Sequence, residues 1–189
     1  MSSPAQSTDN RLSVGDHHAI LNLDRISVLI GAVKDTTEGQ ALVSNYSRWN
    51  DAVHQKPPRL LTIFSTVSFA SDQPQVQDNT PFARLIARFG TFENGSPEDT
   101  IIHKTRWSAT MANSLEQILS ARKINTVVIS GLALSGVVMS TIYRLFDLDY
   151  NIYWRHTAAF SDVLFNKLIP KMSLILISLD ESLQALEQS

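Results

Sequence analysis

Two charged residues and one turn carry the residue types from which this sequence could build a reactive site. Asp24 directly follows the apolar run of residues 19–23, and Lys104 directly follows a short predicted strand, residues 100–103. The turn is formed by residues 134–137, Leu-Ser-Gly-Val, between a strand pattern and a helix pattern. A carboxylate, an ammonium and the N–H donors of a helix start can protonate or deprotonate a substrate and stabilise an adjacent anion.

The segment around that turn predicts how the three features come together. Residues 126–129 are β-branched and apolar, which is typical of a strand buried on both faces of a parallel sheet. From Val137 onward the apolar residues recur at helical spacing, at Val138, Ile142, Leu145 and Phe146. The turn therefore lies at the carboxyl end of a strand, where ligands of open α/β sheets bind. Because Asp24 and Lys104 also end strands, we expect all three features to share one crevice.

The rest of the chain repeats this alternation of strands and helices. Six strands are predicted, at residues 19–23, 59–67, 100–103, 126–129, 150–154 and 174–177. Helices are predicted at residues 37–54, 112–122, 137–146 and 180–186, the last with an acidic N-cap. Such alternation predicts a three-layer α/β/α sandwich with a Rossmann-like parallel sheet and right-handed crossovers. Residues 71–99 are polar and irregular around a short helix at 81–88, and a segment of this kind often forms the lid of a site.

Length and composition limit the classes of protein to which this chain can belong. With 189 residues, of which 43% are hydrophobic and 18% charged, we expect one domain over residues 16–189 and a flexible polar arm over residues 1–15. The net charge of −2 gives no reason to expect a nucleic-acid or membrane partner. No stretch resembles a signal peptide or a membrane span, so we expect a cytoplasmic protein. The chain has no cysteine, which excludes disulfides, thiolate metal sites and a thiol nucleophile.

Three motifs resemble those of the isochorismatase-like hydrolases, a family that includes isochorismatases, nicotinamidases and related amidases. The first, AILNLD, resembles the family's opening strand L-L-x-I-D, with Asp24 at the place of the catalytic aspartate. The second, IIHKTRWSAT, resembles a strand that ends on the catalytic lysine before a Ser-Ala pair, here Lys104, Ser108 and Ala109. The third, residues 124–141, is INTVVISGLALSGVVMST and resembles I-D-T-L-V-L-T-G-V-A-T-D-x-C-V-x-S-T. The resemblance implies the sheet order 3-2-1-4-5-6.

The resemblance also implies a mechanism, from which this chain departs at one position. Val137 stands where the amidase members have a nucleophilic cysteine, and a valine side chain cannot attack a carbonyl. As in isochorismatases, which also lack that cysteine, Asp24 would protonate an enol or enol-ether carbon and water would capture the cation. Lys104 would stabilise the carboxylate or a substrate anion. The family's oxyanion hole implies backbone donors at Ala133, after a cis Leu132–Ala133 bond, and at Val137. No cofactor is expected.

Aromatic and polar residues near the strand ends are predicted to line the substrate pocket. Phe69 and Trp107 could enclose a ring-shaped substrate, although each is explained equally well as ordinary core. Ser135 lies on the turn and His156 follows the fifth strand, so both are candidates for the pocket lining. Family members usually have an acidic residue near the position of His156, so this chain departs from the family pattern a second time here.

Some of these residues could also form a hydrolytic site of a different kind. Ser135 and His156, assisted by Asp24 or Asp162, have the residue types of a Ser–His–Asp site. The G-x-S-x-G elbow that such sites often use is not met, because alanine and valine occupy its glycine positions. The Ser–His site is therefore the weaker alternative.

A metal site is not expected. His17 and His18 are adjacent, but no third ligand stands near them in the sequence. The Asp-x-His metal motif that nicotinamidases carry after their second strand is missing from the segment STVSFASDQ.

The sequence leaves three functions open. The first is hydrolysis of a small carboxylated or enol-ether metabolite, with Asp24 as general acid/base assisted by Lys104. The second is a non-hydrolytic biosynthetic reaction at the same site, as in a dehydratase, isomerase or cyclase. The third is a non-catalytic relative that binds a ligand, which the retention of both charged residues disfavours. In each case the expected partner is a small molecule, and the apolar helix faces would permit a homo-oligomer.

Overall fold

A single parallel sheet organises the protein. The computed structural model of the chain describes residues 14–15, 17–25, 30–31, 34–67, 97–132, 134–155 and 174–188, without the side chain of Ser135. The strands pair in the order β3-β2-β1-β4-β5-β6, all parallel, which confirms the predicted order. Their bounds are β1 His18–Leu23, β2 Leu61–Val67, β3 Thr100–Lys104, β4 Thr126–Gly131, β5 Asn151–Arg155 and β6 Ile175–Ile177.

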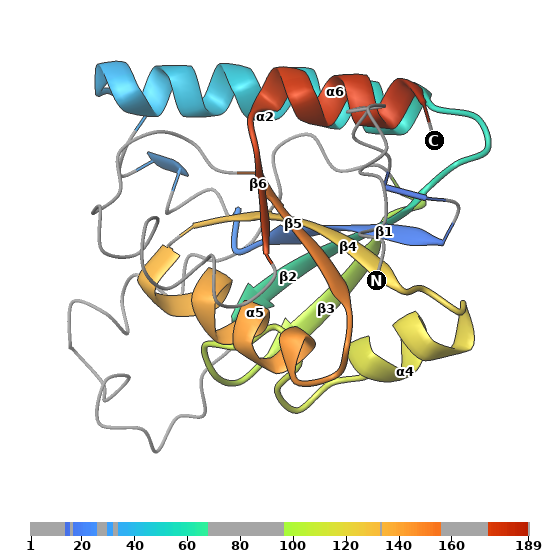
Figure 1. Cartoon of the computed structure of the whole chain (residues 1–189). Coiled ribbons are helices and arrows are strands. Elements are labelled where there is room, and N and C mark those ends of the chain that lie inside the picture. The colour runs from blue at the N-terminus through green and yellow to red at the C-terminus, as the bar shows by residue number, and fades with distance from the viewer. Residues whose placement is uncertain are drawn as a thin grey trace, which may run out of the picture.

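Helices cover both faces of the sheet, so the predicted three-layer α/β/α sandwich is confirmed (Figure 1). One face is covered by α2 and α6, which run side by side, and the other by α4 and α5 (Figure 1). The helix bounds are α2 Thr37–Gln55, α4 Leu115–Ala121, α5 Met139–Phe146 and α6 Leu179–Glu187.

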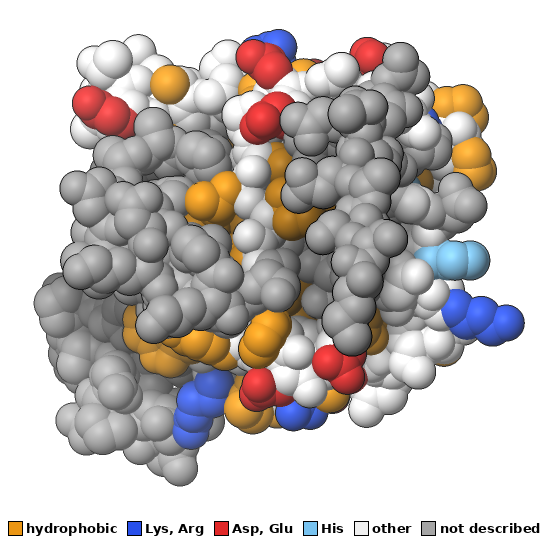
Figure 2. Space-filling model, viewed as in Figure 1, with side chains coloured by type: hydrophobic (Ala, Val, Ile, Leu, Met, Phe, Trp, Pro, Cys, Tyr) orange, Lys and Arg blue, Asp and Glu red, His pale blue; other side chains and the backbone are white. Residues whose placement is uncertain are grey.

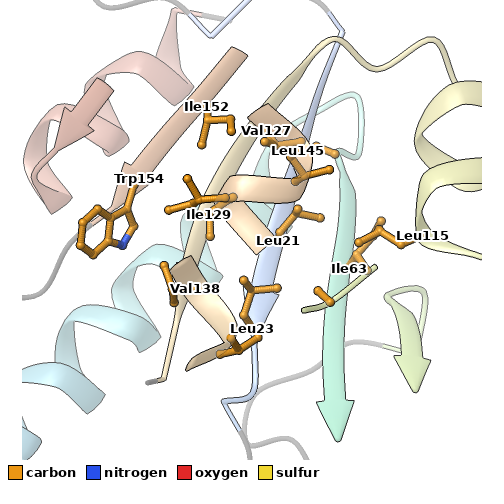
Figure 3. Packing of buried hydrophobic residues seen from close by; sticks show 14 of the residues in the cluster. Leu21, Leu23, Ile63, Leu115, Val127, Ile129, Val138, Leu145, Ile152 and Trp154 are labelled. Atoms are coloured by element: carbon orange, nitrogen blue, oxygen red, sulfur yellow. The ribbon is translucent and has the colours of Figure 1, made fainter. Parts of the chain in front are cut away.

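Successive residues of the central strands supply the two halves of the core. On the α4/α5 face, Leu21 of β1 packs in the cluster that contains Ile129 of β4 (Figure 3). On the α2/α6 face, Ile20 packs with Trp49 of α2 and Val128 of β4. Because both faces are covered, the central strands need apolar side chains in both directions, which explains their continuous apolar sequences.

The sequence of α2 explains both where this helix begins and which side it buries. Thr36 is the N-cap, and its Oγ1 accepts a hydrogen bond from the Gly39 N–H at 2.9 Å. Large buried side chains recur every three or four residues, at Leu42, Tyr46, Trp49 and Val53. The helix predicted over residues 37–54 is therefore confirmed, and its aromatic residues face the sheet.

Two details of the other helices were predicted wrongly. The helix predicted from residue 112 begins at Leu115, because Ala112 has a positive φ of 59° and the Asn113 Oδ1 accepts the Leu115 N–H at 2.9 Å. The N-cap of α6 is Ser178 and not an acidic residue. Ser178 and Glu181 form a capping box, in which each side chain accepts a hydrogen bond from the other residue's backbone N–H.

Some predictions lie outside the described part of the chain. These are residues 71–96 of the proposed lid, including its helix at 81–88, and residues 1–13 of the proposed arm. The lid and the domain boundary therefore stay predictions. Within the described residues, every helix is too short or too polar to cross a membrane. Figure 2 shows acidic and basic side chains interspersed on the face seen there, as the small net charge would suggest.

Candidate active site

Asp24 and Lys104 form a buried ion pair at the carboxyl end of the sheet. Lys104 Nζ donates to Asp24 Oδ2 at 2.8 Å and to the carbonyl oxygen of Arg106 at 3.1 Å. Asp24 is 6% exposed and Lys104 is 1% exposed. The structure thus brings together the two charged residues that the sequence singled out.

A kink in the backbone aims the Asp24 side chain at Lys104. Regular alternation along β1 would place residue 24 on the same face as Ile20 and Asn22, which is the α2 face. Asp24 instead has a φ of +50°, a left-handed conformation that Asp tolerates better than most residues. Its carboxylate consequently turns to the α4/α5 face, where it meets Lys104 of β3 and Ser65 of β2.

Ser65 completes this polar site, although the sequence analysis did not single it out. Its Oγ donates to Asp24 Oδ1 at 3.0 Å, and its carbonyl oxygen accepts the Asp24 N–H at 3.2 Å. Ser65 pairs with Leu23 in the β1–β2 register, directly before Asp24. It also follows Ile63 by two residues, which places both side chains on the α4/α5 face. Ser65 could have been identified from the sequence as a hydroxyl group within a buried apolar strand, because such a group needs a hydrogen-bond partner.

Burial shifts the pKa values of both charged residues toward their neutral forms. Burial raises the pKa of the Asp24 carboxyl, and Lys104 and then Ser65 oppose this shift. Burial likewise lowers the pKa of the Lys104 ammonium, and Asp24 opposes that shift. The two groups titrate as a coupled pair. Burial reduces the free-energy difference between the ion pair and the neutral pair, in which the proton is on Asp24, compared with the same groups in water. A protonated Asp24 is the state that general acid catalysis requires.

The turn after β4 packs directly against the end of β1. A Cβ on Gly131 would lie 2.7 Å from both the Cβ and the carbonyl oxygen of Leu23, so this close approach requires glycine. The Leu132 N–H donates to the same carbonyl oxygen at 3.0 Å. The chain then forms a π-helical turn, Leu134–Val138, before α5 begins, so the predicted start of the helix at residue 137 is wrong. Such turns are frequent at functional sites.

Trp107 packs on this turn from the loop that follows β3. A Cβ on Gly136 would lie 2.0 Å from Cε3 of the Trp107 ring, which shows that the ring lies directly over the glycine. The Ala109 N–H donates to Thr141 Oγ1 at 2.9 Å and ties the loop to α5. Because Trp107 is 58% exposed, it is not an ordinary core residue. Its place in the wall of the substrate pocket stays a prediction.

Four residues predicted to belong to the site cannot be placed. Phe69, Ala133 and His156 lie outside the described residues, as does the side chain of Ser135. Their roles in the pocket, the cis bond before Ala133 and the alternative Ser–His site therefore stay predictions. Within the described part of the chain, no group of three His, Cys, Asp or Glu side chains is arranged to hold a metal ion.

Comparison with protein families agrees with the fold. Residues 18–159, which are most of the chain, match the isochorismatase domain family. This chain belongs to the isochorismatase family. A direct comparison with curated protein sequences finds no match.

Solved structures of isochorismatase family proteins and related hydrolases share this fold. An isochorismatase family protein from Burkholderia thailandensis is 20% identical, with a TM-score of 0.73 over 93% of this chain and 98% of its own. N-carbamoylsarcosine amidase from Thermoplasma acidophilum is 18% identical, with a TM-score of 0.69 over 87% and 98%. A cysteine hydrolase from Pseudomonas syringae pv. phaseolicola is 16% identical, with a TM-score of 0.73 over 91% and 93%. At these identities the likeness shows the fold and leaves the substrate open.

In this member of the isochorismatase family, Val137 is an apolar residue at the position to which the motif resemblance assigns the cysteine of the amidases. Val137 is 1% exposed and packs in the core on the α4/α5 face. Ser140 Oγ donates to the carbonyl oxygen of Gly136 at 2.7 Å and approaches that of Val137 at 3.3 Å, which stabilises the turn. The turn is thus held by packing and hydrogen bonds in a chain without any thiol.

Proposed function

We propose that this protein hydrolyses a small carboxylated or enol-ether metabolite by acid catalysis at Asp24, without a covalent intermediate. The observation that carries this proposal is the 2.8 Å contact between Lys104 Nζ and Asp24 Oδ2 in a buried site of a chain that has no cysteine. Membership of the isochorismatase family supports a hydrolase. Since no thiol exists to form a thioester, the proposed reaction uses the acid–base pair.

In the first step Asp24 acts as the general acid. Its proton passes to the terminal carbon of the enol ether, the C=C bond supplies the electron pair, and positive charge develops on the ether carbon and oxygen. Ser65 stays bonded to Oδ1 and Lys104 to Oδ2, so both stabilise the carboxylate as it forms. The backbone N–H groups of Ala133 and Val137 are proposed to hold the substrate's own carboxylate at the turn.

In the second step water completes the hydrolysis. A water molecule adds to the cationic carbon and gives up one proton, which returns to the Asp24–Lys104 pair. The resulting hemiketal breaks down to a ketone and an alcohol. The protein ends the cycle with the same number of protons and without any bond to the substrate.

A non-hydrolytic reaction of the same pair is the second candidate. The exposed fractions of Asp24 and Lys104, 6% and 1%, leave little access for bulk water to the charged pair. In a dehydratase, isomerase or cyclase the two residues would move protons within the substrate, and no water would be added.

Mass balance of the reaction products distinguishes the two candidates. Purified protein is incubated with isochorismate and a panel of enol ethers, and the products are weighed by mass spectrometry. Hydrolysis gives two products that together contain the substrate plus one water, whereas an isomer or cyclised product keeps the substrate mass and a dehydrated product loses one water. If no member of the panel yields hydrolysis products, the hydrolytic proposal is wrong.

A further inference from the structure

Two arginines at the carboxyl edge of the sheet are buried, and most of their N–H groups have no hydrogen-bond acceptor among the described residues. Arg25 follows Asp24 at the end of β1, and Arg155 is the last residue of β5. Their exposed fractions are 2% and 1%. Among the described residues, no atom accepts a hydrogen bond from Nε or Nη1 of Arg25, or from Nε, Nη1 or Nη2 of Arg155. This is unusual, because buried cations are normally paired with an anion.

Both guanidinium groups lie against aromatic side chains of α2. Cζ of Arg25 is 4.1 Å from the centroid of the Tyr46 ring, and Cζ of Arg155 is 5.5 Å from the centroid of the Trp49 ring. Tyr46 and Trp49 are three residues apart and therefore lie on the same side of α2. The ring faces attract the cations, but they do not accept the N–H groups in the guanidinium planes.

The sheet register brings another donor into the same region. Asn22 of β1 pairs with Ser130 of β4, and Ser130 lies one residue beyond Ile129, which pairs with Trp154 of β5. Arg155 lies one residue beyond Trp154, so Asn22, Ser130 and Arg155 form a row across three strands on the α2 face. Ser130 Oγ donates to Asn22 Oδ1 at 2.9 Å, while Asn22 Nδ2 has no acceptor among the described residues.

The positive charges of this cluster are not compensated within the described part of the chain. Burial lowers the pKa of Arg25 to about 10, and burial followed by repulsion from Arg25 lowers the pKa of Arg155 to about 9. Both guanidiniums therefore stay charged at neutral pH. Asp24 is next to Arg25 in sequence, but its carboxylate is bonded to Lys104 and Ser65 on the opposite face of the sheet.

We propose that Arg25 and Arg155, together with Asn22 Nδ2, form an internal binding site for a small oxyanion group, a carboxylate or a phosphate. The planar forks of two guanidiniums match the paired oxygens of such a group, and the cluster supplies several donors that lack acceptors in the described part of the chain. The kink at Asp24 separates this site from the proton-transfer pair, because it sends the two neighbouring side chains to opposite faces of the sheet. The site does not depend on the proposed reaction.

Titration of the whole protein with sodium phosphate and with sodium acetate tests the site without any substrate. With ionic strength held constant by sodium chloride, at least one of the two anions should raise the melting temperature in a saturable way, and calorimetry should show a single site. Arg25→Met and Arg155→Met should each weaken that binding about tenfold or more. Arg48→Met, at a 57% exposed position on α2, is the matched control and should bind like the wild type.

A second readout keeps the test informative if one variant is less well folded. In buffer without oxyanions, Arg155→Met should melt at or above the wild-type temperature, because a buried unpaired charge has been removed. Addition of the effective anion should reverse that order. Saturation by acetate only assigns a carboxylate, and saturation by phosphate only assigns a phosphate; either supports the site. A wild type that shows no saturable response to either anion, or an Arg155→Met variant that responds equally, would overturn the proposal.

Discussion

Lys104 Nζ lies 2.8 Å from Asp24 Oδ2, although the two residues are 80 positions apart in the chain. The sheet order makes this contact possible, since only β2 separates β1 from β3. Ser65 of that intervening strand binds the second carboxylate oxygen of Asp24. Three neighbouring strands therefore contribute one polar residue each to a single site at the carboxyl edge of the sheet, where α/β proteins bind their ligands.

Replacement of Asp24 by Asn should abolish turnover with little effect on stability. Removal of a general acid typically costs about 10²- to 10⁴-fold in rate. Because burial raises the pKa of the carboxyl and lowers that of Lys104, the variant avoids the cost of a buried carboxylate and the lysine can release its proton. The melting temperature should stay unchanged or rise. Turnover of the enol-ether panel and thermal melting measure the two effects, with Asp51→Asn at an exposed position of α2 as control.

Ser65→Ala should move the alkaline limb of the pH–rate profile to higher pH. The hydrogen bond from Ser65 lowers the pKa of the Asp24 carboxyl, so its removal lets that pKa rise, and an acid catalyst works below its pKa. The loss of a buried hydrogen bond should also cost about 1 kcal/mol in the free energy of unfolding. Ser44→Ala, at an exposed position of α2, should change neither quantity. An alkaline limb that stays in place would show that Ser65 does not act on Asp24.

The stability difference between wild type and Asp24→Asn should depend on pH. In the folded protein the pKa of Asp24 lies above its ordinary value of 3.8. A group of this kind contributes stability that is fully present below pH 3.8 and is lost as the pH rises through the folded-state pKa. Urea denaturation at a series of pH values should therefore show the wild type losing stability relative to the variant as the pH increases. The opposite trend would mean that Lys104 lowers this pKa more than burial raises it.

Gly131→Ala should lower both stability and turnover. The added Cβ would lie 2.7 Å from the Cβ and the carbonyl oxygen of Leu23, and such overpacking typically costs about 1–3 kcal/mol. The strain falls on the end of β1 that positions Asp24, which is why turnover should fall as well. Gly31→Ala is the matched control, because no atom of the described residues is found within 4 Å of its added Cβ. Equal free energies of unfolding for the two variants would contradict the close packing between the turn and β1.

The sheet and the charged pair could be predicted because both depend on local sequence patterns. The run before Asp24 is largely apolar in both directions, which is what a strand covered on two faces requires. The run before Lys104 is a short edge strand, in which Ile101 is 52% exposed. Once the strands are parallel, their carboxyl ends share one edge, so the two residues that follow these runs have to lie on that edge. The order of the strands brings the two residues near each other, and the kink at Asp24 completes the contact.

The remaining features of the site depend on register and on backbone kinks, which leave little trace in the sequence. Ser65 meets Asp24 only because of the pairing between β1 and β2, since the two residues are 41 positions apart in the chain. The positive φ of Asp24 decides which face of the sheet its carboxylate occupies. No neighbouring glycine in the sequence indicates this backbone conformation. Arginine is usually a surface residue, so the sequence does not indicate that Arg25 and Arg155 are buried. Only the packing of α2 against the sheet shows this.

Reaction in D₂O with mass spectrometry of rapidly quenched products tests the acid role of Asp24 most directly. If Asp24 delivers a proton to a substrate carbon, each turnover of isochorismate or of a responsive enol ether by the wild type should place one solvent deuterium on that carbon. Asp24→Asn should form no labelled product above the uncatalysed rate. Turnover by the wild type without deuterium on carbon, or labelling by Asp24→Asn at the wild-type rate, would contradict the account.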